Sequence, residues 1–524
     1  MSGADATGVR RSIAIVAAIV VAAVCASSNL FRGSVERALA ENTMCLGHLA
    51  IEPVIPGQFN VPPGVDGQAV ADCLAWQSFV YLNWRVKPGW ETNPKLRVPD
   101  PSVPPAAFGK PVTDPAAAPT TVWESYYARS ALFPQSAPQG ARSGHLFLTA
   151  LNEFSPHDLF DVQSIQQVGG GWLTGQNKRL VFYDVRANPD LRDYIYDPVN
   201  HLQSAAAQTR CVKLPGGLRL PHGNGGAAPG SGLTDVDCQG NAQRYGMEIG
   251  AIQIKAAWLD LTGAPPEVLS QFLITRADLQ YPNQPVRRDQ TVGLVGIHIV
   301  RKVPGKPGAD QLLWATFEHV RNAPDAAKPP GGTWTFNNGT SSPAANVKPR
   351  KCPNPPATPS PGCTPYDVPI QVARAVPIAP QQRDATEKLV ALIGNNPSVF
   401  KNYELVHVQW PTKANPPAPG ATVPLSVDGM VPSAESPVAN AVIETYMQIN
   451  QKPPTRSCID CHSSAAIAAT DTSRAFKLNA LKLSTTPGTN LIPIYPHRPR
   501  SKALGAAAAG DPASDYSFLF LNAN

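Results

Sequence analysis

The sequence predicts an α+β fold, with a β-rich central body, flanking helices, proline-rich loops and a helical C-terminal segment. Apolar residues recur at three- and four-residue spacing near the two ends of the chain, which is the period of an amphipathic helix. Short apolar and β-branched runs, typical of strands, occupy the middle. The chain has 56 prolines among 524 residues, so irregular connections must separate these elements.

Three segments are predicted to be helical. Residues 66–83 place apolar side chains at helical spacing, and residues 191–210 are a second candidate. A third helix is predicted for residues 436–447, because a serine N-cap and Pro437 precede one apolar stripe. This helix should end before Pro453.

The predicted strands are short runs separated by turn-forming residues. They span residues 179–185, 249–261, 291–301, 311–320 and 403–410. The third and fourth runs flank a Pro-Gly-Lys-Pro-Gly sequence, which predicts a hairpin with a long loop. His298 and His319 each lie on an apolar strand face, and we expect them to face the same way on this hairpin.

The C-terminal region contains the sequence Cys458-Ile459-Asp460-Cys461-His462. Two cysteines and a histidine at this spacing form the attachment site of a c-type haem, in which both thiols become thioethers and His462 is the proximal iron ligand. With 9 Cys and 10 His in the chain, chance predicts roughly 0.003 such matches. The alternatives are a disulfide or half a zinc site beside an incidental histidine. A zinc site needs a second ligand pair at similar spacing, and the sequence has none.

These features predict three regions. Residues 1–40 form a signal peptide or an N-terminal anchor, because Arg10 and Arg11 precede a short apolar run. Two cleavage sites, after Ala26 or after Ala40, stay open. Residues 41–380 form the mixed α and β body. Residues 381–524 form the C-terminal region that binds the haem.

The body includes a proline-rich insertion at residues 324–369. Twelve of its 46 residues are proline. This composition predicts an exposed segment with little regular structure, with a flexible linker as the alternative. The resulting fold is β-rich at its centre and carries the haem on a helical C-terminal segment.

Six cysteines remain outside the N-terminal segment and the haem motif. An even number in an exported chain favours three disulfides, and local pairing is the simplest arrangement. The predicted pairs are Cys45–Cys73, Cys211–Cys238 and Cys352–Cys363. Six buried thiols are the alternative.

The distal side of the haem is less constrained by the sequence. The 62 residues after His462 contain no methionine, and His497 is their only histidine. The candidates for a distal iron ligand are Met447, His298, His319, His497 and Met430. We favour a ligand from the body, because Arg498 and Arg500 beside His497 are better suited to the haem propionates.

Several sequence blocks are distinctive: AWQSF with LNW (75–84), VWE (122–124), IKAAW (254–258), GIHIV (296–300), WATFEH (314–319), ETY (444–446), the haem motif and DYSFL (515–519). Together they resemble a family of exported bacterial proteins known as cytochrome c family proteins. This resemblance runs from about residue 70 to the end. It implies haem attachment and points to Lys255, His298, Glu318 and His319 as residues to test.

The function predicted from the sequence is that of a periplasmic monohaem c-type cytochrome that transfers electrons through one covalent haem c. The alternatives are a haem-dependent oxidoreductase whose large body binds a small molecule, and a haem-based sensor or binding module. The expected partner is a redox protein or a small electron donor or acceptor. The net charge of +6 is spread thinly, without a basic run, so nucleic acid is not expected. Membrane association is expected only if the N-terminal segment is uncleaved.

Overall fold

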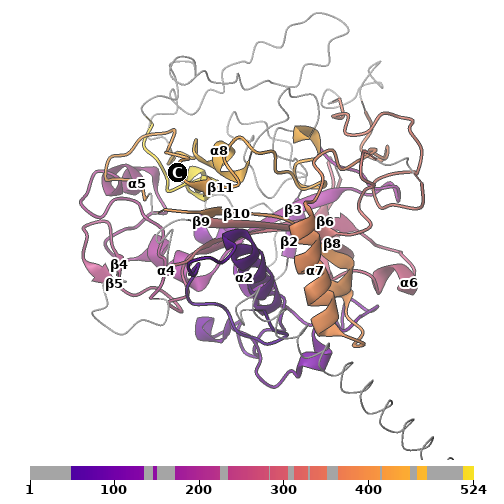
Figure 1. Ribbon diagram of the computed structural model, residues 1–524, viewed down its shortest axis with the longest axis horizontal. Coiled ribbons are helices and arrows are strands. Elements are labelled where there is room, and N and C mark those ends of the chain that lie inside the picture. Colours follow the sequence, from indigo (N-terminus) through magenta and orange to yellow (C-terminus); the bar gives the residue numbers. More distant parts are fainter. Residues whose placement is uncertain are drawn as a thin grey trace, which may run out of the picture.

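The computed structural model describes residues 49–134, 146–149, 171–224, 234–282, 284–304, 312–327, 331–350, 364–413, 416–448, 457–468 and 511–523. A nine-stranded sheet forms its centre (Figure 1). The five longest strands of its main path are β3 (Val181–Ala187), β6 (Ile252–Asp260), β8 (Arg287–Lys302), β9 (Leu312–His319) and β10 (Tyr403–Pro411). They are neighbours in this order and all antiparallel.

Shorter strands extend the sheet at its margins. They are β1 (Tyr127–Ala128), β2 (Leu146–Thr149), β7 (Ile274–Gln280) and β11 (Met430–Val431). β2 and β7 form the sheet's parallel pair among the described strands. A separate two-stranded sheet contains β4 (Asp235–Val236) and β5 (Ala242–Gln243).

Helices α2 (Gly67–Leu82) and α7 (Pro380–Ile393) cover one face of the main sheet (Figure 1). The carboxylate of Asp66 caps α2 by accepting the amide hydrogen of Gln68. Trp76 and Phe79 of α2 pack on Phe317 of β9, with ring centroids 4.7 Å apart in each pair. The helix predicted at residues 66–83 is therefore confirmed.

The opposite face of the sheet lies under the C-terminal part of the chain. Short elements cover it, namely α8 (Cys458–His462) and the 3-10 helices η7 (Thr445–Met447) and η8 (Phe518–Asn522). Figure 1 shows α8 and β11 on the side of the strands away from α2 and α7. The structure confirms the mixed α and β class with a β-rich centre.

All five predicted strands are present, with bounds shifted by a few residues. The predicted hairpin is also present, because β8 and β9 pair antiparallel with Gly296 opposite Glu318. The remaining short elements are η1 (Pro94–Leu96), η2 (Pro105–Ala107), η3 (Trp123–Ser125), α3 (Arg129–Leu132), α6 (Pro266–Leu269) and η6 (Val399–Asn402).

Two helix predictions are wrong in extent. Residues 191–210 divide into α4 (Pro189–Tyr196) and α5 (Ala205–Cys211). Pro198 cannot donate a helical hydrogen bond, and the carboxylate of Asp197 accepts amide hydrogens of the intervening loop.

Residues 436–447 do not form the predicted helix, and only η7 is helical there. The side chain of Asn440 accepts the amide hydrogens of Val442 and Ile443, at 3.0 and 3.2 Å. The Ala441 amide donates to Glu318 on β9, at 2.7 Å. The two local bonds of Asn440 and the tertiary bond to Glu318 replace the ladder of a helix and lay the segment flat on the sheet. Gly296 permits this approach, because a Cβ there would lie 2.7 Å from Val442.

The predicted disulfide between Cys211 and Cys238 is present, with Cα atoms 5.1 Å apart. Cys73 is also disulfide-bonded, and its predicted partner Cys45 lies outside the described residues. The predicted pair of Cys352 and Cys363 lies outside them as well.

Replacing Cys211 and Cys238 with serine is expected to lower the free energy of unfolding by about 2–4 kcal/mol. The bridge closes a loop with a sequence separation of 27 residues, and its removal frees the unfolded chain to a larger set of conformations. Urea unfolding followed by circular dichroism measures the change. An unchanged unfolding midpoint would contradict a stabilising role.

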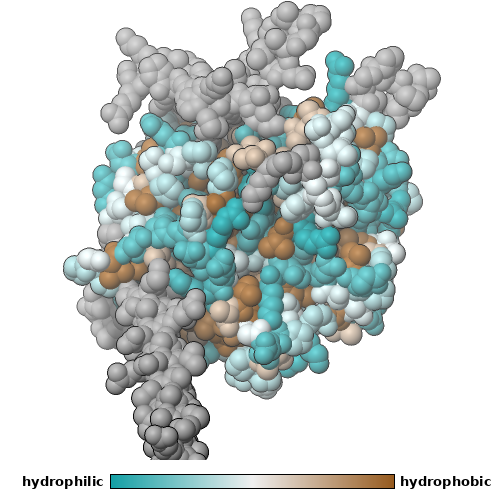
Figure 2. All heavy atoms as spheres, turned by 45° about the vertical axis from the view of Figure 1, so that its right-hand side comes forward, coloured by the Kyte–Doolittle hydropathy of each residue, from teal (hydrophilic) through white to brown (hydrophobic). Residues whose placement is uncertain are grey.

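The visible surface in Figure 2 is mainly hydrophilic, with apolar residues in small separate groups. No helix within the described ranges is long and apolar enough to cross a membrane. The predicted signal peptide or anchor, residues 1–40, lies outside those ranges.

Candidate haem-attachment site

Helix α8 is a single turn that holds the two cysteines of the motif. The hydroxyl of Ser457 caps it by accepting the amide hydrogen of Asp460, at 3.2 Å. Cys458 and Cys461 are three positions apart, so their side chains project from the same side of the turn. Both are thiols and both are half-buried.

The sheet fixes the position of this turn. Ile459 is buried, and its amide donates to the side-chain oxygen of Gln409 on β10, at 3.0 Å. The side-chain nitrogen Nε2 of Gln409 donates in turn to the carbonyl of Pro432, at 2.8 Å. The motif is thus tied to the central sheet by a buried polar side chain.

His462 has a defined orientation. Its Nδ1 lies 2.7 Å from the carbonyl oxygen of Tyr516. A carbonyl oxygen only accepts, so Nδ1 carries the hydrogen and Nε2 keeps its lone pair. Burial lowers the pKa of His462 to about 4, which keeps the imidazole neutral. The ring lies beside Trp314 and Phe518, with centroid distances of 4.3 and 4.9 Å.

The segment that supplies this carbonyl has an unusual backbone. Asp515 and Tyr516 have positive φ angles of 50° and 63°, in the left-handed region that non-glycine residues rarely adopt. Lys302 holds the turn through a 2.5 Å ion pair with Asp515, and both side chains are only 1% exposed. The same carboxylate accepts the amide hydrogen of Leu220, at 2.7 Å. Such strain persists only where surrounding contacts enforce it.

A second group of polar side chains lies on the same face of the sheet. Nε2 of His298 lies 2.7 Å from a carboxylate oxygen of Glu444. Lys255 occupies the position opposite His298 on the neighbouring strand. Its ammonium lies 5.4 Å from the centre of the Tyr183 ring.

The environment shifts the pKa values of two members of this group. Burial lowers the pKa of Lys255, and the nearby Glu444 opposes that shift. Burial alone would raise the pKa of Glu444, but His298 and Lys255 outweigh it and the pKa is lowered. Lys255, His298 and Glu444 also interact electrostatically with His462, so the group lies close to the motif.

The other candidate distal ligands are placed differently. Met430 is buried on β11 in the apolar core that also contains Trp314 and Ile459. Met447 lies on η7 and is partly exposed. The described residues do not include His497, Arg498 or Arg500.

The expectation that His298 and His319 share a face of the hairpin is wrong. His298 pairs with Thr316 in the register, so residue 319 points to the other face. Nε2 of His319 donates to the carbonyl of Gln271, at 3.1 Å, and Nδ1 accepts the amide hydrogen of Arg321, at 3.2 Å. The ring stacks on Phe272, away from the haem motif.

His319 is expected to make the fold sensitive to acid. Burial lowers its pKa from 6.5 to about 4. The unfolded chain therefore binds the proton first, and stability falls as the pH drops from about 6.5 towards 4, by at most about 3 kcal/mol from this residue. Urea titration measures the free energy of unfolding of wild type and His319→Gln at each pH in this range. Plotted against pH, it should change more steeply in the wild type than in the variant. Equal slopes would contradict the prediction.

Glu318 links the 436–447 segment to Arg374 and does not belong to the group around His298. It accepts the Ala441 amide and forms a buried ion pair with Arg374. Burial raises its pKa to about 7. Arg374 also bonds Glu404, at 2.7 Å, and lies 3.4 Å from Asp325.

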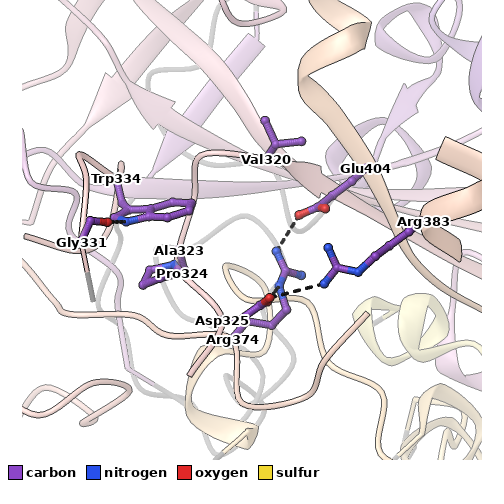
Figure 3. A pocket seen from close by; sticks show the side chains of 9 residues that line it. All are labelled: Val320, Ala323, Pro324, Asp325, Gly331, Trp334, Arg374, Arg383 and Glu404. Carbon is purple, nitrogen blue, oxygen red and sulfur yellow. Dashed lines mark hydrogen bonds and ion pairs between the residues drawn. The ribbon is translucent and has the colours of Figure 1, made fainter. Parts of the chain in front are cut away.

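A pocket of about 220 Å³ adjoins Arg374. Its lining residues are Val320, Ala323, Pro324, Asp325, Gly331, Trp334, Arg374, Arg383 and Glu404. Figure 3 shows Arg374 and Arg383 directed at the carboxylates of the same pocket. Its charged groups thus pair with one another.

The residues of the site fit a covalently attached haem. The motif offers two thiols on one side of a turn, and His462 offers an oriented Nε2. Beside it the buried indole nitrogen of Trp314 has no hydrogen-bond partner within the described structure. No group of three or more His, Cys, Asp or Glu side chains among these residues is arranged to hold a bare metal ion.

Three residues of the site were not found by sequence reasoning: Tyr516, Trp314 and Glu444. All three belong to sequence blocks noted above, but nothing local assigns them a role. Comparisons with protein-family models, with curated proteins and with solved structures found no match to this chain.

Proposed function

We propose that this chain is an exported monohaem c-type cytochrome. Cys458 and Cys461 would hold the haem through thioethers, and Nε2 of His462 would be the proximal ligand. The observation that carries this proposal is the 2.7 Å bond from Nδ1 of His462 to the Tyr516 carbonyl. A hydrogen bond at the other ring nitrogen fixes the tautomer and orientation of a metal-binding histidine.

The bound haem would supply one-electron chemistry, with its potential set by the axial ligands, burial and nearby hydrogen bonds. Trp314 and Phe518 would restrict water around His462. The Tyr516 carbonyl would increase the basicity of the imidazole and so favour the oxidised state. Both effects require only groups already in place, two side chains and one backbone carbonyl.

Electron transfer is the simplest role, and a haem-dependent oxidoreductase is the second candidate. The group of Lys255, His298 and Glu444 favours the second. Three ionisable side chains on one sheet face near the motif exceed what holding a haem requires. Two of them, Lys255 and Glu444, have shifted pKa values, and such groups concentrate at reactive sites. We propose the periplasm as the compartment, with a redox protein or a small donor or acceptor as partner.

Spectroscopy of the full chain purified from the cell envelope tests this proposal. Pyridine haemochrome spectra should show one haem c per chain, and dithionite and ferricyanide should cycle it reversibly. A six-coordinate haem inert to added ligands would favour electron transfer, and an iron that accepts them would favour the oxidoreductase. Protein that carries no haem c after export through a functional maturation system would refute both.

A further inference from the structure

We propose that Lys255, His298 and Glu444 form an acid–base site for a small protic ligand, HX, which gives up its proton and binds the haem as X⁻. This inference rests on the proposed haem attachment and adds the class of ligand. Hydrogen cyanide and hydrogen peroxide are molecules of this class. The three side chains come from β6, β8 and the segment that lies flat on the sheet.

The register of the sheet places this group relative to His462. Lys302 and Gln253 hold the 515–517 turn, through Asp515 at 2.5 Å and Ser517 at 2.8 Å. Lys255 lies two residues beyond Gln253 along β6, on the same face. The Tyr516 carbonyl therefore lies near the start of β6 and the end of β8. The acid–base group lies closer to the middle of these strands, on the same face.

His462 lies between these two points. Its ring contacts Trp314, which pairs with Val300 in the register, while His298 is two residues further in along β8. Nδ1 is directed at Tyr516, so Nε2, on the far side of the ring, points away from that turn. A haem bound through Nε2 of His462 would therefore face the group of Lys255, His298 and Glu444.

His298 is suited to proton transfer rather than to iron ligation. The nitrogen that would bind iron, Nε2, is already 2.7 Å from the Glu444 carboxylate. A carboxylate partner orients an imidazole and stabilises it once it accepts a proton. Glu444 is itself fixed, because a carboxylate oxygen accepts the Asn440 amide at 2.9 Å.

The reaction balances without a further reagent. Nε2 of His298 faces Glu444, so HX would release its proton to Nδ1, and Glu444 would stabilise the imidazolium. X⁻ would then be the ligand of the haem. No electron is transferred in this step. Lys255 contributes a positive charge that favours the anion, and its ammonium lies 5.4 Å from the centre of the Tyr183 ring.

Cyanide binding to the ferric full-length protein tests the inference without an activity assay. Stopped-flow absorbance in the haem Soret band gives the association rate. His298→Gln is expected to slow association by about 10²-fold or more, the range of a positioned proton acceptor. Glu444→Gln, which keeps the size of the side chain, should slow it less. His319→Gln is the matched control, because it replaces a buried histidine on the opposite face of the same hairpin and should leave the rate unchanged.

Three results would overturn the inference. One is wild-type protein that binds no cyanide, and another is a His298→Gln variant that binds it at the wild-type rate. The third is loss of a low-spin spectrum in His298→Gln alone, which would make His298 an iron ligand. Folding of each variant is checked by circular dichroism, and Lys255→Met serves if either of the other two variants fails to fold. Absence of covalent haem from the wild type would instead refute the proposed function itself.

Discussion

Replacing Cys458 and Cys461 together with alanine is expected to abolish covalent haem in the protein. These thiols project from one side of α8 and are the groups that would add to the haem vinyls. Haem-dependent peroxidase staining of a denaturing gel should fall to background. His462 would remain oriented by Tyr516 and could still hold some haem. Without thioether bonds, that haem would be extractable into acidified organic solvent.

The matched control is the double replacement of Cys211 and Cys238 with serine. It also removes two cysteines, but these form a structural disulfide and are not part of the motif. This variant should be less stable and still carry covalent haem. Equal haem staining in both double variants would show that attachment does not depend on α8.

Replacing Lys302 with methionine is expected to lower the free energy of unfolding by about 3–5 kcal/mol. The ammonium is the ionic partner of Asp515, and both side chains are 1% exposed. Its removal leaves a buried carboxylate that keeps only hydrogen bonds such as that from Leu220. Urea unfolding measures the loss. Because Asp515 and Tyr516 lie in a strained turn, the change should also loosen the carbonyl bond to His462. The reduction potential of the proposed haem should then rise.

A double variant separates charge from packing. Asp515→Asn added to Lys302→Met removes the unpaired charge, and asparagine tolerates the positive φ at that position. Most of the lost stability should return. If the single Lys302 variant is as stable as wild type, the ion pair does not hold the turn.

The strands and α2 could be predicted from the sequence because their signals are local. An apolar helical period over residues 66–83 and five β-rich runs each specify an element without help from distant residues. The segment 436–447 had an equally good helical stripe. It is not a helix because Glu318 and Asn440 satisfy its amides, and Glu318 lies more than one hundred residues away in the chain.

The candidate site likewise contains residues that the local sequence identifies and residues that only the tertiary structure brings together. The spacing of Cys458, Cys461 and His462 identifies the attachment motif, since its chemistry is encoded within five residues. The carbonyl of Tyr516 and the carboxylate of Glu444 reach their partners only through tertiary folding. His319 faces away from the site because adjacent strand residues point to opposite sides of the sheet, and the register pairs His298 with Thr316. The sequence does not specify this register.

Mass spectrometry of the exported, denatured wild-type protein tests the central claim most directly. After proteolysis, the peptide containing Cys458 and Cys461 should carry the mass of one haem, bound through both thioethers. His462 should lie in the same peptide. An unmodified peptide, with all haem extracted into acidified organic solvent, would contradict the account.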